Sequence, residues 1–306
     1  MIWDDAKLII SRDTVDIDWL KLNVMCPVPI VLNNNVIRVY AAFCDERNRG
    51  RVGYVDVDRA NPSIVLGISE DPCMDIGSPG TFDDSGVLPT CMIQERDTLY
   101  MYYCGFQKQV NVPYTSLLGI AVSNDGGNNF HRIKNTPVLE RVQGELFIRT
   151  GAFCVCSGDE YELYYASGDE WFELYEGKLE PIYNLKRIST EDMSTFTGKG
   201  SVVINLQNDE YGITIPQYFK NKEKEQLLFS VRSCNRGYRL EYATKNLGEW
   251  VRQGEIGIAD NATGWYREMQ CFGKILRVDG RTMLFFSGNH YGIGGMGWTE
   301  LIENKN

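Results

Sequence analysis

The sequence of 306 residues predicts an all-β protein built as one five-bladed β-propeller domain over residues 1–306. A segment with the same order of strand-like runs and turns recurs about five times along the chain, as in ring-shaped repeat folds. Each copy holds runs of β-branched and aromatic residues bounded by turn residues. No segment shows helical periodicity over more than two turns.

The clearest copy of the repeat covers residues 83–130, where three strand-like runs are followed by a tight turn at Asp125-Gly126. Each copy is expected to form strand A, a hairpin turn, strand B, a longer loop, strand C, a turn and strand D. The N-terminal run AKLIIS (6–11) is expected to add the outer strand of the last copy, which ends near Leu301. The weaker copies are 29–59, 150–196, 215–250 and 269–301.

The motif S-x-D-x-G-x-x-aromatic at 123–130 has two interpretations. The structural one assigns a turn capped by Asp125, with Phe130 packed between neighbouring blades. The functional one assigns a binding loop at this turn. The structural interpretation is the favoured one.

Charge and composition exclude several classes of partner. The net charge is -10 and no run of Lys or Arg occurs, which argues against nucleic acid and anionic membrane surfaces. No segment approaches the length of a membrane span, and the N-terminus lacks the pattern of a signal peptide. The nine cysteines are an odd number and several lie in apolar runs, which predicts free thiols and a cytoplasmic location.

Metal and cofactor chemistry has little support in the sequence. The chain holds two histidines, so a multi-histidine metal site is excluded within one chain. No cysteine cluster has the spacing of a zinc site. We therefore expect neither a metal nor another cofactor.

Charged residues precede strand A in three copies of the repeat: Asp83 and Asp84 in the second, Arg149 in the third and Glu268 in the fifth. A propeller gathers these strand starts around its axis, so Asp84 and Glu268 are expected to face each other with Arg149 between them. Two opposed carboxylates are the minimum for cleaving a glycosidic bond. Arg149 would keep one of them ionised. The alternative is that these charges form a salt bridge that seals the axial channel.

Further candidates for binding a substrate lie at the ends of the predicted B strands, on the same face as the starts of the A strands. Trp171 begins an aromatic-rich insert and could stack on a sugar ring, or could simply pack at the rim. The other candidates are Asp45, Arg47, Tyr103, Asp169, Arg232, Asn289 and His290.

Residues 82–106 (FDDSGVLPTCMIQERDTLYMYYCGF) and 117–139 (LLGIAVSNDGGNNFHRIKNTPVL) resemble the five-bladed propeller glycosidases, which include glycoside hydrolase families 32, 43, 62, 68 and 130. GWYREMQCF (264–272) and FFSGNHYGIGGMGW (285–298) resemble the last blade of relatives often found in bacterial surface-polysaccharide gene clusters. The resemblance implies a carbohydrate-directed function, with Asp84 as base or nucleophile and Glu268 as acid.

One departure from the family pattern leaves the reaction open. Cys26, in NVMCPVPIVL, stands where arabinanase-type hydrolases have an acidic residue. Hydrolysis, phosphorolysis and transfer of a glycosyl group therefore all remain candidate reactions. The alternative is a non-catalytic propeller that binds a carbohydrate or nucleotide-sugar, or that acts as a scaffold in polysaccharide biosynthesis.

Overall fold

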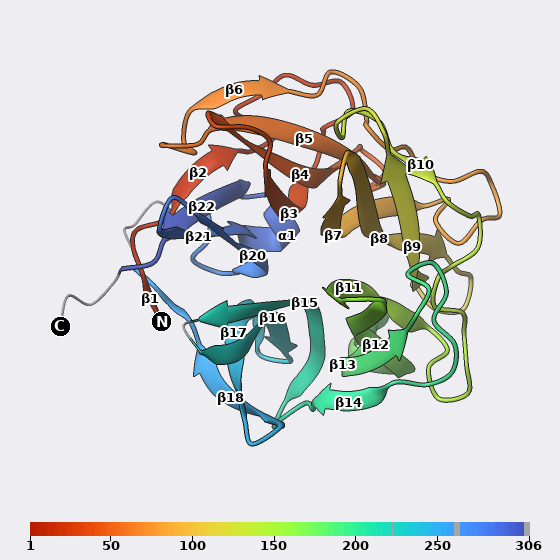
Figure 1. Ribbon diagram of the computed structural model, residues 1–306. Helices are drawn as coiled ribbons and strands as arrows, with labels where there is room; N and C mark the ends of the chain where they lie inside the picture. Colours follow the sequence, from red (N-terminus) through yellow and green to blue (C-terminus); the bar gives the residue numbers. More distant parts are fainter. Residues whose placement is uncertain (222, 260–263, 303–306) are drawn as a thin grey trace.

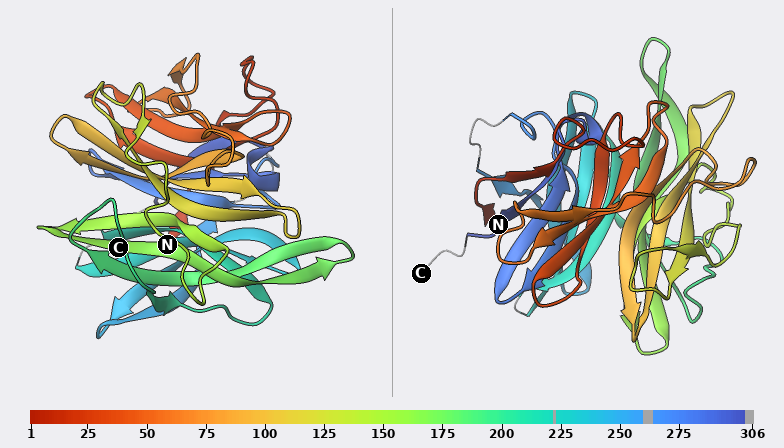
Figure 2. Two further views of the ribbon diagram at one scale, coloured as in Figure 1. Left: turned by 90° about the vertical axis from the view of Figure 1, so that its right-hand side faces the viewer. Right: turned by 90° about the horizontal axis from the view of Figure 1, so that it is seen from above.

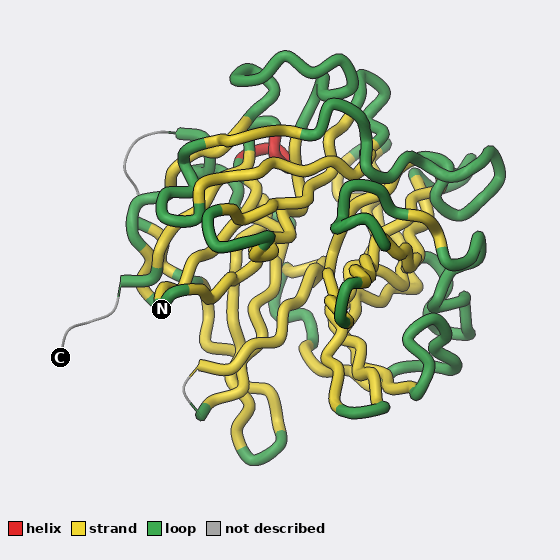
Figure 3. Tube along the Cα trace, turned by 45° about the horizontal axis from the view of Figure 1, so that its top comes forward, coloured by secondary structure: helices red, strands yellow, loops and turns green. Residues whose placement is uncertain are grey.

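The computed structural model describes residues 1–221, 223–259 and 264–302. Within these ranges the chain consists of β-strands, connecting loops and one helical turn, α1 (Asn289–Gly292). Figure 3 shows strands throughout the molecule and loops mainly at its periphery. The predicted all-β fold class is therefore confirmed.

The strands pair as antiparallel meanders of four that follow the copies of the sequence repeat, with one strand of each near the centre (Figure 1). From the central strand outward, the first four meanders are β3 (Val24–Val31), β4 (Val36–Cys44), β5 (Gly50–Asp58) and β6 (Val65–Ile68); β7 (Gly86–Glu95), β8 (Thr98–Lys108), β9 (Tyr114–Ser123) and β10 (His131–Arg132); β11 (Ile148–Ser157), β12 (Glu160–Tyr175), β13 (Lys178–Thr190) and β14 (Ser201–Ile204); and β15 (Glu210–Asn221), β16 (Lys224–Ser233), β17 (Arg236–Asn246) and β18 (Glu249–Glu255).

The last meander uses both ends of the chain. It consists of β20 (Cys271–Val278), β21 (Arg281–Ser287), β22 (Met296–Glu300) and the N-terminal β2 (Lys7–Ile10). Strand β2 pairs antiparallel with β22, which confirms the predicted role of the AKLIIS run. A further short pair, β1 (Ile2–Trp3) with β19 (Gly257–Ile258), is parallel.

Three of the meanders are joined into one twelve-stranded sheet, a feature that the sequence did not predict. The joints are parallel contacts at the beginning of central strands. Ser116 of β9 pairs with Ile148 of β11, and Tyr183 of β13 pairs with Gly212 of β15. The meanders lie close enough there for backbone pairing.

The core lies between neighbouring meanders. One cluster joins Tyr102 and Leu118 of the second meander to Leu163 of the third. Another places Phe130 against Tyr40 of the first meander, with the ring centroids 5.5 Å apart. Asp125 accepts hydrogen bonds from the backbone of the same turn, so the structural interpretation of the 123–130 motif is confirmed.

Each central strand contains an irregularity close to its beginning, where its register with the next strand shifts. At these bulges Cys26, Gly151, Ile215 and Phe272 have positive φ, between 48° and 61°. Positive φ is uncommon for residues other than glycine, and a β-branched Ile is a clear outlier. The bulges turn side chains of the central strands toward the axis.

The cysteines are all free thiols, and seven of the nine are buried. Burial raises the pKa of the Cys104 and Cys91 thiols to about 11, so both are protonated at neutral pH. In the part of the chain that the structure describes, no helix is long and apolar enough to cross a membrane.

Candidate functional site

A cavity of about 360 Å³ opens where the central strands begin. Every one of the five meanders contributes to its wall, through Cys26, Gly86, Thr150, Ile215 and Phe272 among others. The position is the axial one that the repeat predicts. Its volume lies within the usual range for small-molecule sites, about 300–1,000 Å³.

Apolar residues form one side of this cavity. Three of the bulge residues, Cys26, Ile215 and Phe272, pack with Leu88 and Cys104 in one buried cluster. The pKa of the Cys26 thiol is raised well above its ordinary value, first of all by burial. Cys26 is therefore a neutral wall residue and supplies no negative charge.

A buried ion pair forms the polar side of the cavity. Glu180 of β13 and Arg232 of β16 both line it, and Arg232 Nη2 lies 2.8 Å from Glu180 Oε2. The Lys178 ammonium lies 3.2 Å from the other carboxylate oxygen. Glu180 therefore has two cationic neighbours.

Tyrosine side chains surround the Arg232 guanidinium. Its central carbon lies 5.4 Å from the ring centroids of both Tyr183 and Tyr238 and 4.4 Å from that of Tyr211. Nη1 of Arg232 donates a hydrogen bond to the Tyr291 hydroxyl at 3.3 Å. Aromatic rings stabilise a nearby cation through their negative faces.

Three tyrosines of the cavity wall, Tyr114, Tyr183 and Tyr238, are neutral. Burial raises the pKa of Tyr114, Tyr183 and Tyr238, although the positive charge of Arg232 lowers it in part. The hydroxyls of Tyr183 and Tyr238 also share a hydrogen bond. Among the described residues that line the cavity, Glu180 is therefore the only anionic side chain.

Three of the residues predicted from the sequence, Arg232, Trp171 and Asp84, are at or beside this cavity. Arg232 lines it, as expected from its place at the end of a B strand. Trp171 packs edge-to-face on Tyr114, a cavity residue, with centroids 5.5 Å apart, and also contacts Phe147. Trp171 thus has the rim position that was one of its two interpretations.

Asp84 lies next to the cavity without lining it. Its carboxylate accepts hydrogen bonds from the Gly80 backbone at 2.9 Å and from the Ser85 hydroxyl at 2.7 Å. Ser85 and Gly86, which follow it, are wall residues. Asp84 is half-buried.

Asp83 and Tyr103 belong to a buried polar cluster outside the cavity. The Asp83 carboxylate is fully buried and lies 2.7 Å from Arg132 Nε. It accepts hydrogen bonds from the hydroxyls of Tyr103 and Thr81 at 3.0 and 2.8 Å. All of these contacts lie within the second meander and stabilise it. The positions of Asp83 and Tyr103 therefore give no support to the prediction that they bind a substrate.

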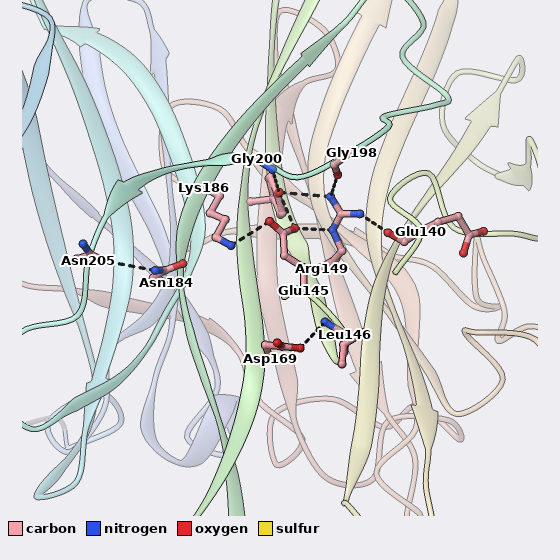
Figure 4. Close-up of polar contacts among 11 residues, drawn as sticks. Glu140, Glu145, Leu146, Arg149, Asp169, Asn184, Lys186, Gly198, Gly200 and Asn205 are labelled. Atoms are coloured by element: carbon pink, nitrogen blue, oxygen red, sulfur yellow. Dashed lines mark hydrogen bonds and ion pairs between the residues drawn. The ribbon is translucent and has the colours of Figure 1, made fainter. Parts of the chain in front are cut away.

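Arg149 forms a closed salt bridge with Glu145, not with Asp84 or Glu268, and this bridge lies outside the cavity wall (Figure 4). Its Nε lies 2.7 Å from Glu145 Oε2, and both side chains are fully buried. Lys186 lies 2.9 Å from the other oxygen of Glu145, and Tyr165 donates a hydrogen bond to this carboxylate. Arg149 is not a wall residue, so it does not stand between Asp84 and Glu268 in the cavity.

Glu268 and His290 pair at the surface. Their side chains are 68% and 66% exposed, and His290 Nε2 lies 3.2 Å from Glu268 Oε2. Asn289 lies beside them and accepts hydrogen bonds from the backbone N–H groups of Glu268 and Met269. Its role is to connect α1 to the start of β20. None of the three lines the cavity, so the structure does not bring Glu268 together with Arg232 and Glu180.

The remaining predicted residues stabilise loops. Asp45 accepts hydrogen bonds from the backbone of Arg47 and Arg49 and lies 3.0 Å from Arg51. Asp169 accepts a hydrogen bond from the backbone of Leu146 at 3.1 Å. These contacts account for both carboxylates without a ligand.

The sequence analysis did not find several cavity residues. Glu180 carried a signal, because it is a single acidic residue in the apolar run KLEPIY at the beginning of a long strand. Tyr238 and Tyr291 carried none, since tyrosine is common in strands throughout this chain. Among the described residues, no group of three or more His, Cys, Asp or Glu side chains is placed to hold a metal ion.

Solved structures share this fold. A glycoside hydrolase superposes with a TM-score of 0.70 at 12% identity, covering 97% of this chain and 90% of its own. A family 32 β-fructofuranosidase of Bombyx mori, solved in complex with sucrose, gives a TM-score of 0.67 at 16% identity over 98% of this chain and 63% of its own. An endo-arabinase of Bacteroides thetaiotaomicron gives 0.62 at 11% identity over 95% and 98%.

Among curated proteins, the uncharacterized protein Rv1502 of Mycobacterium tuberculosis is 26% identical over 293 residues, which cover 94% of this chain and 95% of that protein. No family model matches the chain. The predicted resemblance to the propeller glycosidases is confirmed by the solved structures. The chain thus has the fold of the β-propeller glycoside hydrolases.

Proposed function

We propose that this protein is a carbohydrate-active, single-domain, five-bladed β-propeller that binds a sugar in its axial cavity. The observation that carries the proposal is the cavity itself, with polar and aromatic side chains at the beginning of the central strands. The four-stranded meanders support the blade count. The structural neighbours include a complex with sucrose, which supports a sugar as the ligand.

The chemistry of the wall suits a sugar. A sugar presents hydroxyl groups at its edges and C–H groups on its faces, so its sites combine hydrogen-bonding groups with apolar or aromatic surfaces. Here Glu180, Ser116 and Thr150 supply polar groups, while Phe272 and the tyrosines supply flat apolar surface. The wall groups named here can bind the sugar itself, whether or not the sugar carries a nucleotide.

The geometry favours binding over bond cleavage. Glycoside hydrolysis requires two carboxyl groups separated by about 5–9.5 Å, one of which donates a proton. Among the described wall residues only Glu180 has a carboxylate, and both of its oxygens lie in ion pairs, with Lys178 and Arg232. A binding or scaffolding role in polysaccharide biosynthesis is consistent with this arrangement.

Cleavage of a glycosidic bond is the second candidate function. Asp84 favours it, because this half-buried carboxylate adjoins the wall residue Ser85. In this proposal Asp84 is the base or nucleophile and Glu268 the acid, and substrate binding must move Glu268 toward the cavity. A cytoplasmic location suits either function.

Binding and turnover assays separate the two functions. Calorimetry should detect a sugar that binds the native protein, and chromogenic aryl glycosides, with and without phosphate, should detect turnover. If the protein is an enzyme, Asp84→Asn and Glu268→Gln each lower kcat at least about a hundredfold. The surface variant Glu249→Gln is the control. Sugar binding that both variants retain, with no turnover of any glycoside, establishes the binding function.

A further inference from the structure

We infer that the sugar in the axial cavity carries an anionic group, a carboxylate or a phosphate, and that Arg232 and Lys108 receive it. This inference rests on the proposed function and specifies its ligand class. Its basis is the charge of the wall and a set of polar atoms there that lack partners in the protein.

The wall is cationic although the protein is strongly acidic. The charged side chains that line the cavity are Lys108, Glu180 and Arg232. Lys178, which lies 3.2 Å from Glu180, adds a third positive charge beside them. Three cations and one carboxylate therefore lie at or beside the cavity, in a chain whose net charge is -10. The excess positive charge favours an anionic ligand.

Arg232 retains hydrogen-bonding capacity inside the protein. Its side chain is 6% exposed; Nη2 lies 2.8 Å from Glu180 Oε2, whereas Nε has no hydrogen-bond partner in the described part of the chain. Nε is therefore the position at which the guanidinium can donate to an oxygen of a bound carboxylate or phosphate. A buried donor without an acceptor is unfavourable, and a ligand oxygen removes this cost.

Other unpartnered polar atoms lie on the same wall. The hydroxyls of Ser116 and Thr150 and the side-chain oxygen of Asn23 are buried, and none has a hydrogen-bond partner in the described residues. Hydroxyl groups both donate and accept, so they fit the ring hydroxyls of a sugar. The wall thus offers a cationic part and a hydroxyl-binding part, the combination that an acidic sugar requires.

Lys108 gives the cavity an exposed cation. It lies at the end of β8, at the cavity, and forms no ion pair within 4 Å in the described residues. An exposed ammonium attracts an anion at long range and is screened by salt. Lys108 is also a safe site for substitution, because removing it leaves no buried group unpaired.

Isothermal titration calorimetry with matched sugars tests the inference on the whole chain. The pairs are glucose with glucuronate, galactose with galacturonate, and glucose with glucose 1-phosphate. We expect the acidic member of at least one pair to bind about tenfold or more tighter than its neutral partner, and less so at high salt. A comparison of the uronates with glucose 1-phosphate shows whether the anionic group that binds is a carboxylate or a phosphate.

The outcomes distinguish the inference from the function on which it rests. If neutral members bind as tightly as acidic ones in every pair, the inference is wrong and the sugar-binding function stands. If no sugar binds, both are wrong. Binding of inorganic phosphate alone, with no sugar bound, also contradicts both.

Substitutions in the cavity wall test whether the preference for an acidic sugar depends on the residues named above. Lys108→Ala should weaken binding of the acidic sugar about three- to tenfold more than binding of the neutral partner. Lys224→Ala, at an exposed lysine of β16, is the matched control. Arg232→Gln combined with Glu180→Gln removes both buried charges together and should abolish the preference for the acidic sugar. If this double variant fails to fold, the Lys108→Ala result still decides: equal losses for both sugars refute the inference.

Discussion

At the scale of single residues, charged groups in this protein have two distinct roles. Asp83 and Arg149 are fully buried, and each pairs with an oppositely charged group in the interior of the protein. Glu180 and Arg232 also pair, but beside a cavity. A charge at the beginning of a central strand therefore does not by itself identify a binding residue; what matters is whether the charged group borders the open volume.

Asp45 gives a test of these structural charges. Burial disfavours its ionised form, but hydrogen bonds from Arg49, Arg51 and Arg47 outweigh this and lower its pKa to about 2. Because the folded pKa is below the ordinary value of 3.8, ionised Asp45 stabilises the fold above about pH 4, and this contribution is lost as the pH falls toward 2. Asp45→Asn should lower the free energy of unfolding by about 2 kcal/mol at pH 7, a difference that shrinks below pH 4.

Urea unfolding at several pH values measures this difference. The control is Asp97→Asn, which changes an exposed aspartate and should leave the stability nearly unchanged at every pH. An Asp45→Asn deficit that persists undiminished at low pH would contradict the electrostatic explanation.

The charge of Lys274 should lower the stability of the fold, whereas the charge of Asp45 raises it. Burial lowers its pKa from 10.5 to about 8, and its ammonium donates a hydrogen bond to the Pro216 carbonyl at 2.8 Å. Between about pH 8 and pH 10.5 the unfolded chain binds more protons at this site than the folded one, so stability due to Lys274 rises with pH. Below pH 8 both states are charged and the burial penalty applies in full.

Lys274→Met should therefore remove a rise in stability between about pH 8 and pH 10. The measured quantity is the free energy of unfolding of the native protein minus that of the variant, compared with the same difference for the exposed Lys224→Met. Tyrosines and thiols also titrate in this pH range, but they do so in the native protein and in the variant alike, so their contribution cancels in the difference. A difference that does not change with pH would show that Lys274 is not desolvated.

At the scale of strands, the N-terminal segment completes the last meander. β2 pairs with β22, and Trp3 is fully buried in the cluster that contains Leu284 and Phe286. Trp3→Ala should lower the free energy of unfolding by about 3–5 kcal/mol because it leaves a large cavity. Ile2, next to it in the same strand, is 56% exposed, so Ile2→Ala should cost less than about 0.5 kcal/mol.

Guanidinium-induced unfolding of the two variants checks the prediction. Equal stability of Trp3→Ala and Ile2→Ala would mean that the N-terminal strands do not hold the fold closed. A loss of stability specific to Trp3→Ala would confirm that the N-terminal segment packs into the core beside the last meander.

The hairpin of β12 and β13 is the most prominent single element. Figure 2 shows it projecting beyond the neighbouring strands. Trp171 and Glu180 lie on its two strands, and Phe172 pairs with Glu180 in the antiparallel register. One hairpin thus contributes both the aromatic rim residue and the acidic wall residue. The sequence analysis placed an insert here but treated the region as a loop.

At the scale of the whole molecule, the fold was predictable because the repeat is visible in the chain. Strand runs and turns predicted the meanders, and the largely apolar N-terminal run AKLIIS predicted the closing strand β2. The site was less predictable, since strand starts are recognisable from turns but side-chain direction is not. A bulge shifts the pattern by one residue, and the bulges at Cys26, Ile215 and Phe272 decide which side chains reach the axis.

This explains the particular misplacements. Arg149 lies just before the bulge at Gly151, and its side chain enters the core cluster with Glu145 while Thr150 reaches the cavity. Arg232 was predicted correctly as a cavity residue because its strand, β16, ends beside the axis. Glu180 was missed because it lies on a third strand, β13, which the simple repeat places away from the axis.

The most direct test of the account is a crystal structure of the protein with the tightest-binding acidic sugar of the calorimetric series. We predict electron density for the sugar in the axial cavity, with its anionic group hydrogen-bonded to Nε of Arg232 and its hydroxyls near Ser116 and Thr150. Density for the sugar elsewhere on the surface, with the axial cavity unchanged, would contradict the account.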